Sequence, residues 1–122
     1  MSETKELNFL NNLLDQVLVI DKSKTICFAN LNAKNRFGEN ILNQNISSII
    51  RDPALLDNIQ NSLNDKSSST IDVETKKPNY QYYKVSIMPG PKNIFNVEET
   101  VIIFFKDLTD IIKAQKLKSD FV

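Results

Sequence analysis

Few side chains in this sequence could carry out chemistry, and their types exclude most familiar reactions. The chain contains no histidine, so it offers no imidazole base, no histidine ligand for haem or zinc, and no serine–histidine–aspartate triad. One cysteine, Cys27, cannot form an internal disulfide and is a poor basis for a zinc site. Two glycines, Gly38 and Gly90, are too few for a glycine-rich phosphate loop. We therefore expect neither a metal nor a cofactor.

The remaining candidates for chemistry are carboxylates and the single thiol. Asp52 and Asp57 could act as a catalytic pair, but five residues apart on one helix they would point in different directions. Cys27 stands between apolar neighbours, where a free cysteine behaves as a small hydrophobic residue rather than a redox sensor. The sequence therefore favours a binding or signalling domain over an enzyme. A catalytic domain that uses paired carboxylates is the least favoured interpretation.

The overall composition is typical of one folded domain. The chain has 122 residues, of which 41% are hydrophobic and 25% charged, which is enough for a single core. The net charge is zero, so we expect no nucleic-acid partner and no electrostatic attraction to an anionic membrane. The apolar runs, such as residues 101–105, are too short to span a bilayer. With one cysteine and no visible signal peptide, we expect a cytoplasmic domain.

Local patterns predict a helix, a β-hairpin and a short second helix in the first part of the chain. Leu7, Leu10 and Leu14 repeat at helical spacing, which predicts a helix that packs on its own domain or on a partner. Residues 17–20 and 25–29 are apolar runs joined by a polar turn, as in a hairpin. The short helix that follows should be capped by Asn30 at its start and by Gly38 at its end.

The rest of the chain predicts one longer helix, three strands and a C-terminal helix. Asp52 followed by Pro53 indicates a helix start, and apolar residues then recur at helical spacing to about Asn64. Strands of alternating polarity are expected at residues 70–75 and 80–88. The last strand, residues 100–107, is apolar on both faces, so both should be covered. Together these elements predict an α+β fold, in which a five-stranded antiparallel sheet carries short helices on one face and has flanking helices at both ends.

Two motifs, one in the first hairpin and one at the end of the last strand, carry a family resemblance. "VLVIDKSKTICFANLNAKNRFG" has a strand ending in aspartate, a turn, a second strand, then Asn-x-x-Ala and a closing Phe-Gly. "FFKDLTD" has a last strand that ends in Asp-x-Thr. Both resemble the PAS domain, the small sensor module of signalling proteins. The matching positions are Asp21, Asn30, Ala33, Phe37, Gly38, Asp107 and Thr109.

Two further stretches resemble one kind of parent protein. "KLKSDFV", residues 116–122, is similar to the segment that in bacterial sensor histidine kinases runs into the helix bearing the phosphorylated histidine. "RDPALLDNI", residues 51–59, resembles the cytoplasmic PAS domain of phosphate-regulon-type sensor kinases. The resemblance implies three parts: a linker helix at 1–11, a PAS sensor domain at 12–108, and a signalling helix at 109–122 that leads to a histidine-containing dimerisation domain outside this chain.

The resemblance implies a sensor and dimerisation module with no catalysis of its own. A ligand or an upstream segment would bias the C-terminal helix, and a homodimer would relay the change to the kinase domains and through them to a response regulator. Asp107 and Thr109 would form this relay, with Asp107 holding the helix start to the domain; the alternative is plain capping of that helix. The parent could be anchored in the inner membrane. A connector that binds no ligand and only dimerises is the alternative function.

The resemblance also limits the cofactors and suggests sites. Flavin photoreceptor PAS domains carry Asn-Cys-Arg on the helix after the second strand, whereas Cys27 is on that strand itself. Haem PAS domains use an axial histidine, so neither haem held by histidine nor a cysteine-adduct flavin is expected. The candidates that line an apolar pocket or pack as solid core are Phe28, Asn30, Phe37, Ile50, Leu56, Ile59, Tyr83, Ile103 and Phe105. The candidates for a dimer seam are Leu7, Leu10, Leu14, Ile111, Leu117 and Phe121.

Overall fold

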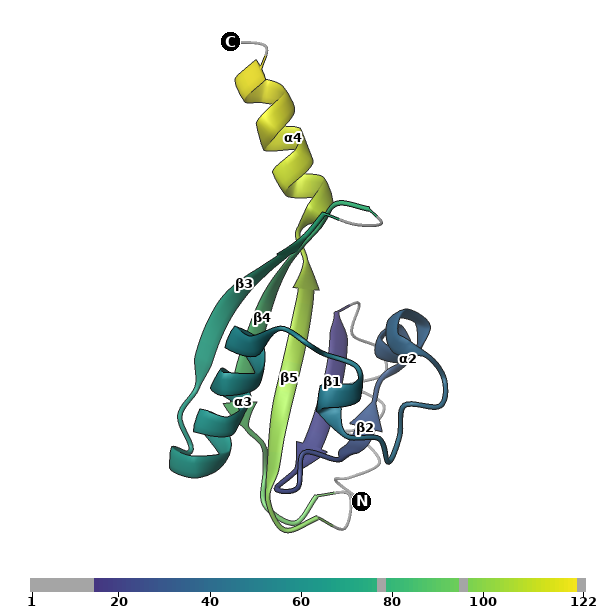
Figure 1. Ribbon diagram of the computed structural model, residues 1–122, viewed down its shortest axis with the longest axis vertical. Helices are drawn as coiled ribbons and strands as arrows, with labels where there is room; N and C mark the ends of the chain where they lie inside the picture. The colour runs from purple at the N-terminus through teal and green to yellow at the C-terminus, as the bar shows by residue number, and fades with distance from the viewer. Residues whose placement is uncertain (1–14, 77–78, 95–96, 121–122) are drawn as a thin grey trace.

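The computed structural model describes residues 15–76, 79–94 and 97–120 (Figure 1). The elements follow in the order β1 (Gln16–Asp21), β2 (Ile26–Ala29), α2 (Leu31–Phe37), the 3-10 turn η1 (Ile46–Ser48), α3 (Pro53–Asp65), β3 (Ser69–Thr75), β4 (Gln81–Pro89), β5 (Thr100–Asp107) and α4 (Thr109–Asp120). The expected N-terminal helix with Leu7, Leu10 and Leu14 lies outside the described residues, as do Phe121 and the side chain of Leu117.

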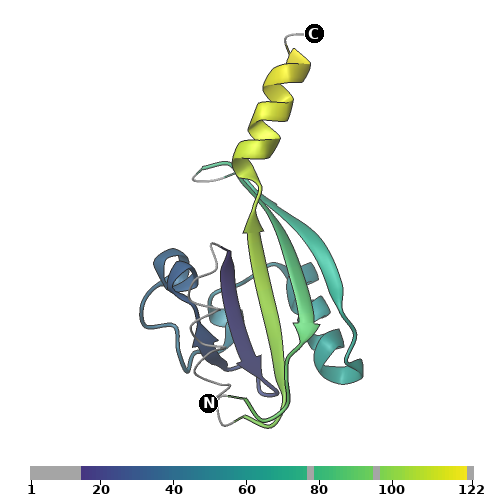
Figure 2. The ribbon, with the colours of Figure 1, turned by 180° about the vertical axis from the view of Figure 1, so that it is seen from behind.

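The five strands form one antiparallel sheet in the order β2-β1-β5-β4-β3. The first and last strands pair with each other at its centre. The helices α2 and α3 lie on one face of the sheet, and α4 continues past the end of β5 and projects away from it (Figure 1). Figure 2 views the other face, where the strands lie in front of α3. The predicted α+β fold with helices on one face of an antiparallel sheet is confirmed.

Local signals determine where the helices begin and end. The side chain of Asn30 accepts a hydrogen bond from the backbone N–H three residues on and so caps α2, which ends at Gly38 with a positive φ of 116°. The side chain of Asp52 caps α3 in the same way, with Pro53 as the first helical residue. α3 ends at Lys66, which has the left-handed conformation. Both predicted helices are confirmed because these signals act within a single turn.

Alternating residues of the sheet face the helices and form the core. Leu18 of β1 and Ile103 of β5 are fully buried there together with Ile59 of α3. The opposite face is also apolar at the sheet centre, where Val19 is buried and its partner Ile102 is half-buried. The central strand β5 therefore has apolar side chains on both faces, as its sequence predicted, and the helices cover one of them.

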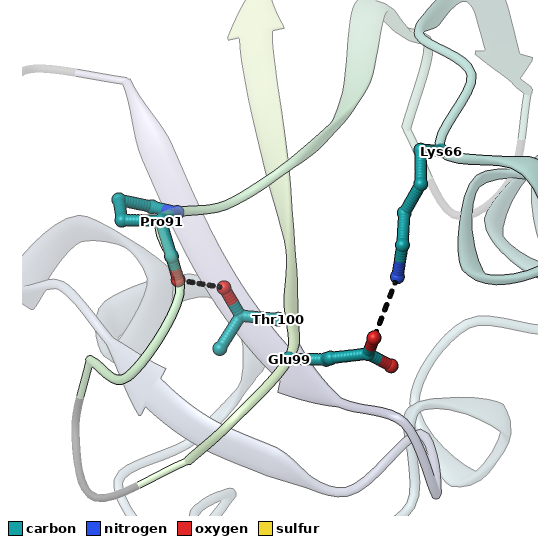
Figure 3. Close-up of polar contacts among 4 residues, drawn as sticks. All are labelled: Lys66, Pro91, Glu99 and Thr100. Carbon is teal, nitrogen blue, oxygen red and sulfur yellow. Dashed lines mark hydrogen bonds and ion pairs between the residues drawn. The ribbon is translucent and has the colours of Figure 1, made fainter.

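An ion pair joins the residue after α3 to the residue before β5 (Figure 3), at the end of the sheet far from α4 (Figure 1). Lys66 Nζ lies 3.1 Å from Glu99 Oε1, and the Thr100 hydroxyl donates to the Pro91 carbonyl at 3.2 Å. A Cβ atom on Gly90 would lie 2.2 Å from Thr100 Oγ1, so this turn requires glycine. The ion pair is exposed and contributes little, whereas the Thr100 side chain lies so close to the Gly90 backbone that it leaves no room for a Cβ atom.

Candidate functional site

The junction between β5 and α4 is held by hydrogen bonds to the neighbouring strand β4. The Thr109 hydroxyl oxygen accepts a hydrogen bond from the Tyr82 N–H at 3.0 Å, and the Leu108 N–H donates to the Tyr82 carbonyl at 2.8 Å. Asp107 Oδ1 accepts from the Thr109 N–H at 2.9 Å. The linking residue Leu108 and the first residue of α4, Thr109, are thus bonded to the two backbone polar groups of Tyr82 in β4. Any rotation of α4 about its axis at this point must break or exchange these bonds.

A second contact lies two residues before Tyr82, at the same end of the sheet. The ammonium group of Lys116, two turns into α4, lies 5.0 Å from the centre of the Tyr80 ring, just before β4 begins. The start of β4 therefore contacts α4 through Tyr82 at the junction and through Tyr80 further along the helix. Figure 1 shows α4 leaving the sheet at this corner, where β3, β4 and β5 converge.

An open groove of about 810 Å³ adjoins the junction, between α2 and the ends of three strands. Its wall combines one cationic group, one anionic group, four amide side chains and two aromatic rings. The lining residues are Gln16, Asn32, Asn35, Arg36, Phe37, Ile49, Gln81, Tyr83 and Asp107. The volume falls in the range of small-molecule sites, and most of the wall is polar. Asp107 belongs to both the groove and the junction.

Arg36 is positioned by the two aromatic rings of the groove. Its guanidinium group donates a hydrogen bond to the Tyr83 hydroxyl and lies 4.0 Å from the centre of the Tyr83 ring and 5.1 Å from that of Phe37. Burial raises the pKa of Tyr83 above its ordinary value; the charge of Arg36 opposes this rise and that of Asp107 adds to it. Tyr83 therefore stays protonated at neutral pH and lies in the field of both charges.

Two polar atoms of groove residues are buried without a hydrogen-bond partner in the described part of the chain. They are Arg36 Nε, which is a donor, and Gln16 Oε1, which is an acceptor. Buried polar atoms are nearly always satisfied by protein, water or ligand. Both atoms are covered by neighbouring protein atoms, so a molecule in the groove could bond to them only after these side chains turn toward it.

Comparison with solved structures identifies the fold of this chain. No protein-family model matches the sequence, and no curated protein matches it either. The PAS domain of nitrogen regulation protein NR(II) from Vibrio parahaemolyticus matches with a TM-score of 0.64 and 22% identity, over 84% of this chain and 96% of that one. The chain has the PAS fold.

Two other PAS structures agree with this assignment. The PAS domain of BvgS from Bordetella pertussis matches with a TM-score of 0.66 and 15% identity, over 98% of both chains. A sensory box sensor histidine kinase from Vibrio cholerae matches with a TM-score of 0.61 and 21% identity, over 88% of this chain and 93% of that one. None of the three is described as a phosphate-regulon sensor, so the subtype suggested by residues 51–59 is not supported. In the described part of the chain, no helix is both long and apolar enough to cross a membrane.

Most of the predicted pocket residues pack in the PAS core on the helix side of the sheet. Those in the core or against it are Phe37, Ile50, Leu56, Ile59, Tyr83, Ile103 and Phe105. Two of them, Phe37 and Tyr83, also line the groove. Phe28 lies on the other face of the sheet, because it pairs with Val19, and so it does not line the helix-side interior.

Asn30 is fully buried, and its side chain hydrogen-bonds to the backbone rather than to a cavity. Its Oδ1 accepts from the N–H groups of Val17 and Ala33, at 3.0 and 2.9 Å, and its Nδ2 donates to the Asp15 carbonyl at 2.8 Å. The residue therefore joins the start of β1 to the start of α2. Of the two roles open from sequence, this geometry favours the structural one.

Cys27 is half-buried on β2, and its thiol donates to the Val19 carbonyl at 3.4 Å. Burial, with a smaller contribution from Asp21, raises the pKa of this thiol to about 11. A thiol with such a high pKa holds its proton and is a poor nucleophile. The environment agrees with the interpretation of Cys27 as a small hydrophobic residue.

Sequence reasoning singled out Asp107 for the relay but missed the other polar residues of the groove. Arg36 is one of several basic residues in the chain, and the amides Gln16 and Gln81 lie in strands far apart in sequence. No spacing pattern connects these positions, because sheet pairing brings them together. The one available signal was the placement of Arg36 directly before Phe37, which was itself a candidate.

Proposed function

We propose that this chain is a sensory PAS module of a two-component histidine kinase and that it relays its signal through α4. The observation that supports this is the hydrogen-bonded junction at which β5 passes into α4 after a single residue, Leu108. A rigid connection of this kind carries a change in the sheet directly into the helix. The similarity to PAS domains of sensor proteins supports the same proposal.

The proposed mechanism is a population shift between two arrangements of α4. In one, the Thr109 side chain and Leu108 backbone keep the bonds to Tyr82 described above; in the other, some of these bonds are exchanged and the helix changes its angle. The kinase domains of the same chain would respond to this change, and a response regulator would receive the phosphoryl group from the parent protein. The module would act in the cytoplasm, with a parent that could be anchored in the inner membrane.

The relay can be tested in a fusion of this chain to a histidine-kinase core, with autophosphorylation as the measurement. Thr109→Val removes the acceptor for the Tyr82 N–H but keeps the side-chain shape. We expect kinase activity to change by about fivefold or more, the lower end of a typical coupling free energy. Thr75→Val is the matched control, because the buried Thr75 hydroxyl has no partner in the described part of the chain. Unchanged activity with only a loss of stability in Thr109→Val would reduce the junction to a helix cap.

A homodimer is the second part of the proposal. Ile111 lies in the first turns of α4, and 54% of its surface is exposed, which is unusual for a large apolar side chain on a helix that projects from its domain. Two such helices could pair along this side. Ile111→Glu should shift the chain toward monomer in sedimentation equilibrium, whereas Lys113→Glu, on a different side of the helix, should not. Equal sedimentation of both variants and wild type would remove Ile111 from the seam.

The ligand-free connector is the second candidate, and one observation favours it. The helix-side interior, where the pocket was predicted, holds fully buried core side chains such as Ile59 and Ile103. A thermal-shift screen of small metabolites separates the two functions. A metabolite that raises the melting temperature in a saturable way supports a sensor, and the absence of any such metabolite supports a connector.

A further inference from the structure

The groove beside the junction holds two opposite charges that do not neutralise each other directly. Arg36 and Asp107 both line it, and no ion pair joins them among the described residues. A lone anion in this groove would be attracted by Arg36 and repelled by Asp107. A lone cation would be attracted by Asp107 and repelled by Arg36. Only a molecule that carries both charges gains from both side chains.

The two unsatisfied atoms of the groove match its two charges: the donor belongs to the cationic Arg36, and the acceptor lies near the anionic Asp107. Arg36 Nε is a buried donor without a partner among the described residues, and an ionised carboxylate is the acceptor that a guanidinium binds best. Gln16 Oε1 is a buried acceptor that has no partner within residues 15–76, 79–94 and 97–120, and an ammonium group would donate to it. Gln16 lies near Asp107, because Gln16 pairs with Phe105, two residues before Asp107 on β5. An ammonium group could therefore contact Gln16 and Asp107 together.

The geometry points to a binding site in this groove for a small zwitterion, with a carboxylate at Arg36 and an ammonium group at Gln16 and Asp107. Free amino acids and short peptides have this chemistry. The inference rests on the proposed function, because it names the class of ligand that would bias the junction. Asp107 connects the groove to the junction, since its Oδ1 accepts a hydrogen bond from the Thr109 N–H and its carboxylate also lines the groove. A ligand that competes for this carboxylate would favour one arrangement of α4 over the other.

The test uses this chain labelled with ¹⁵N and follows its amide signals during titration with four kinds of probe. The probes are the common L-amino acids taken singly, alanyl-alanine, acetate and methylammonium. We expect at least one amino acid or the dipeptide to shift the signals of Arg36, Tyr83 and Asp107 in a saturable way. Acetate and methylammonium should not, because each satisfies one charge and is repelled by the other. Saturable binding of acetate alone would show a plain anion site and overturn the proposal, as would the absence of binding by every zwitterion.

Variants then locate the site. Arg36→Gln and Asp107→Asn should each weaken binding by about ten- to a hundredfold, as expected for loss of one hydrogen-bonded charge. Asp107→Asn retains the oxygen that accepts from the Thr109 N–H, so it removes the charge while leaving the junction bond in place. Lys34→Gln on the same helix and Asp110→Asn in the first turn of α4 are the matched controls, since neither residue lines the groove. Binding that survives both groove variants would place the ligand elsewhere.

The result remains decisive if a variant does not fold. The spectrum of each variant reports its folding directly, and the wild-type comparison of zwitterions with singly charged probes needs no variant. Failure of the zwitterion site is also distinguishable from failure of the relay. The relay is measured by the Thr109→Val fusion without added ligand, so an active relay with an empty groove would leave the proposed function standing and remove only this inference.

Discussion

Replacing Asn30 by alanine should destabilise the fold far more than replacing a typical helix cap. The side chain is fully buried, and its hydrogen bonds to Val17, Ala33 and Asp15 join the start of β1 to the start of α2. In Asn30→Ala the N–H groups of Val17 and Ala33 lose their acceptor, and the Asp15 carbonyl loses a donor. A buried group left unsatisfied costs about 1–3 kcal/mol, so we expect a loss of about 3–5 kcal/mol in the free energy of unfolding.

Urea denaturation followed by circular dichroism measures this loss, and the chain offers a matched control. Asn45 caps the 3-10 turn η1 in the same way, but it is exposed, so Asn45→Ala should cost about 1 kcal/mol or less. Asn30→Asp keeps the acceptor atom but turns a carboxylate toward the Asp15 carbonyl. This variant should be less stable than the wild type because it loses the bond donated to the Asp15 carbonyl, but it keeps the acceptor for the Val17 and Ala33 N–H groups. A loss in Asn30→Ala no larger than that in Asn45→Ala would refute this account.

Three further predictions concern single side chains away from the groove. Cys27, with its pKa raised from 9.0 to about 11, should react with iodoacetamide about a hundredfold more slowly in the folded chain than in urea, with a rate that rises with pH; equal rates would contradict its burial. Gly90→Ala should cost about 1–3 kcal/mol in urea denaturation, because the new Cβ would overlap Thr100 Oγ1. Ser62→Ala should leave the melting temperature unchanged or raise it, because the buried Ser62 hydroxyl has no partner in the described part of the chain; a clear fall would mean that the hydroxyl is bonded.

The elements of this fold were predictable because their signals are local. The caps Asn30 and Asp52 act on backbone groups within one turn, and they marked the starts of α2 and α3 correctly. The alternation of Tyr83, Val85 and Ile87 marked the buried face of β4 for the same reason. The two-sided apolar character of β5 predicted that both its faces would be covered, although the sequence could not show that this strand is central or that its partners are β1 and β4.

The candidate sites were less predictable, because sheet pairing determines which residues meet. The local patterns in residues 17–38 predicted that Phe28 shares an interior with Ile59, yet the β1–β2 register puts Phe28 on the other face. Asp107 and Thr109 were recognised from their motif, but the partner of Thr109, the Tyr82 backbone, was not. A side chain that bonds to a distant backbone N–H leaves no trace in the sequence around either residue.

The sequence by itself therefore determined the class of the fold, the positions of its helices and strands, and the absence of histidine chemistry. These depend on composition and on contacts between residues a few positions apart. Only the tertiary structure decided that Arg36, Tyr83 and Asp107 line one groove and that Asp107 also holds the start of α4. The three residues come from α2, β4 and β5, and the pairing of β4 with β5 and the packing of α2 against the sheet bring them together.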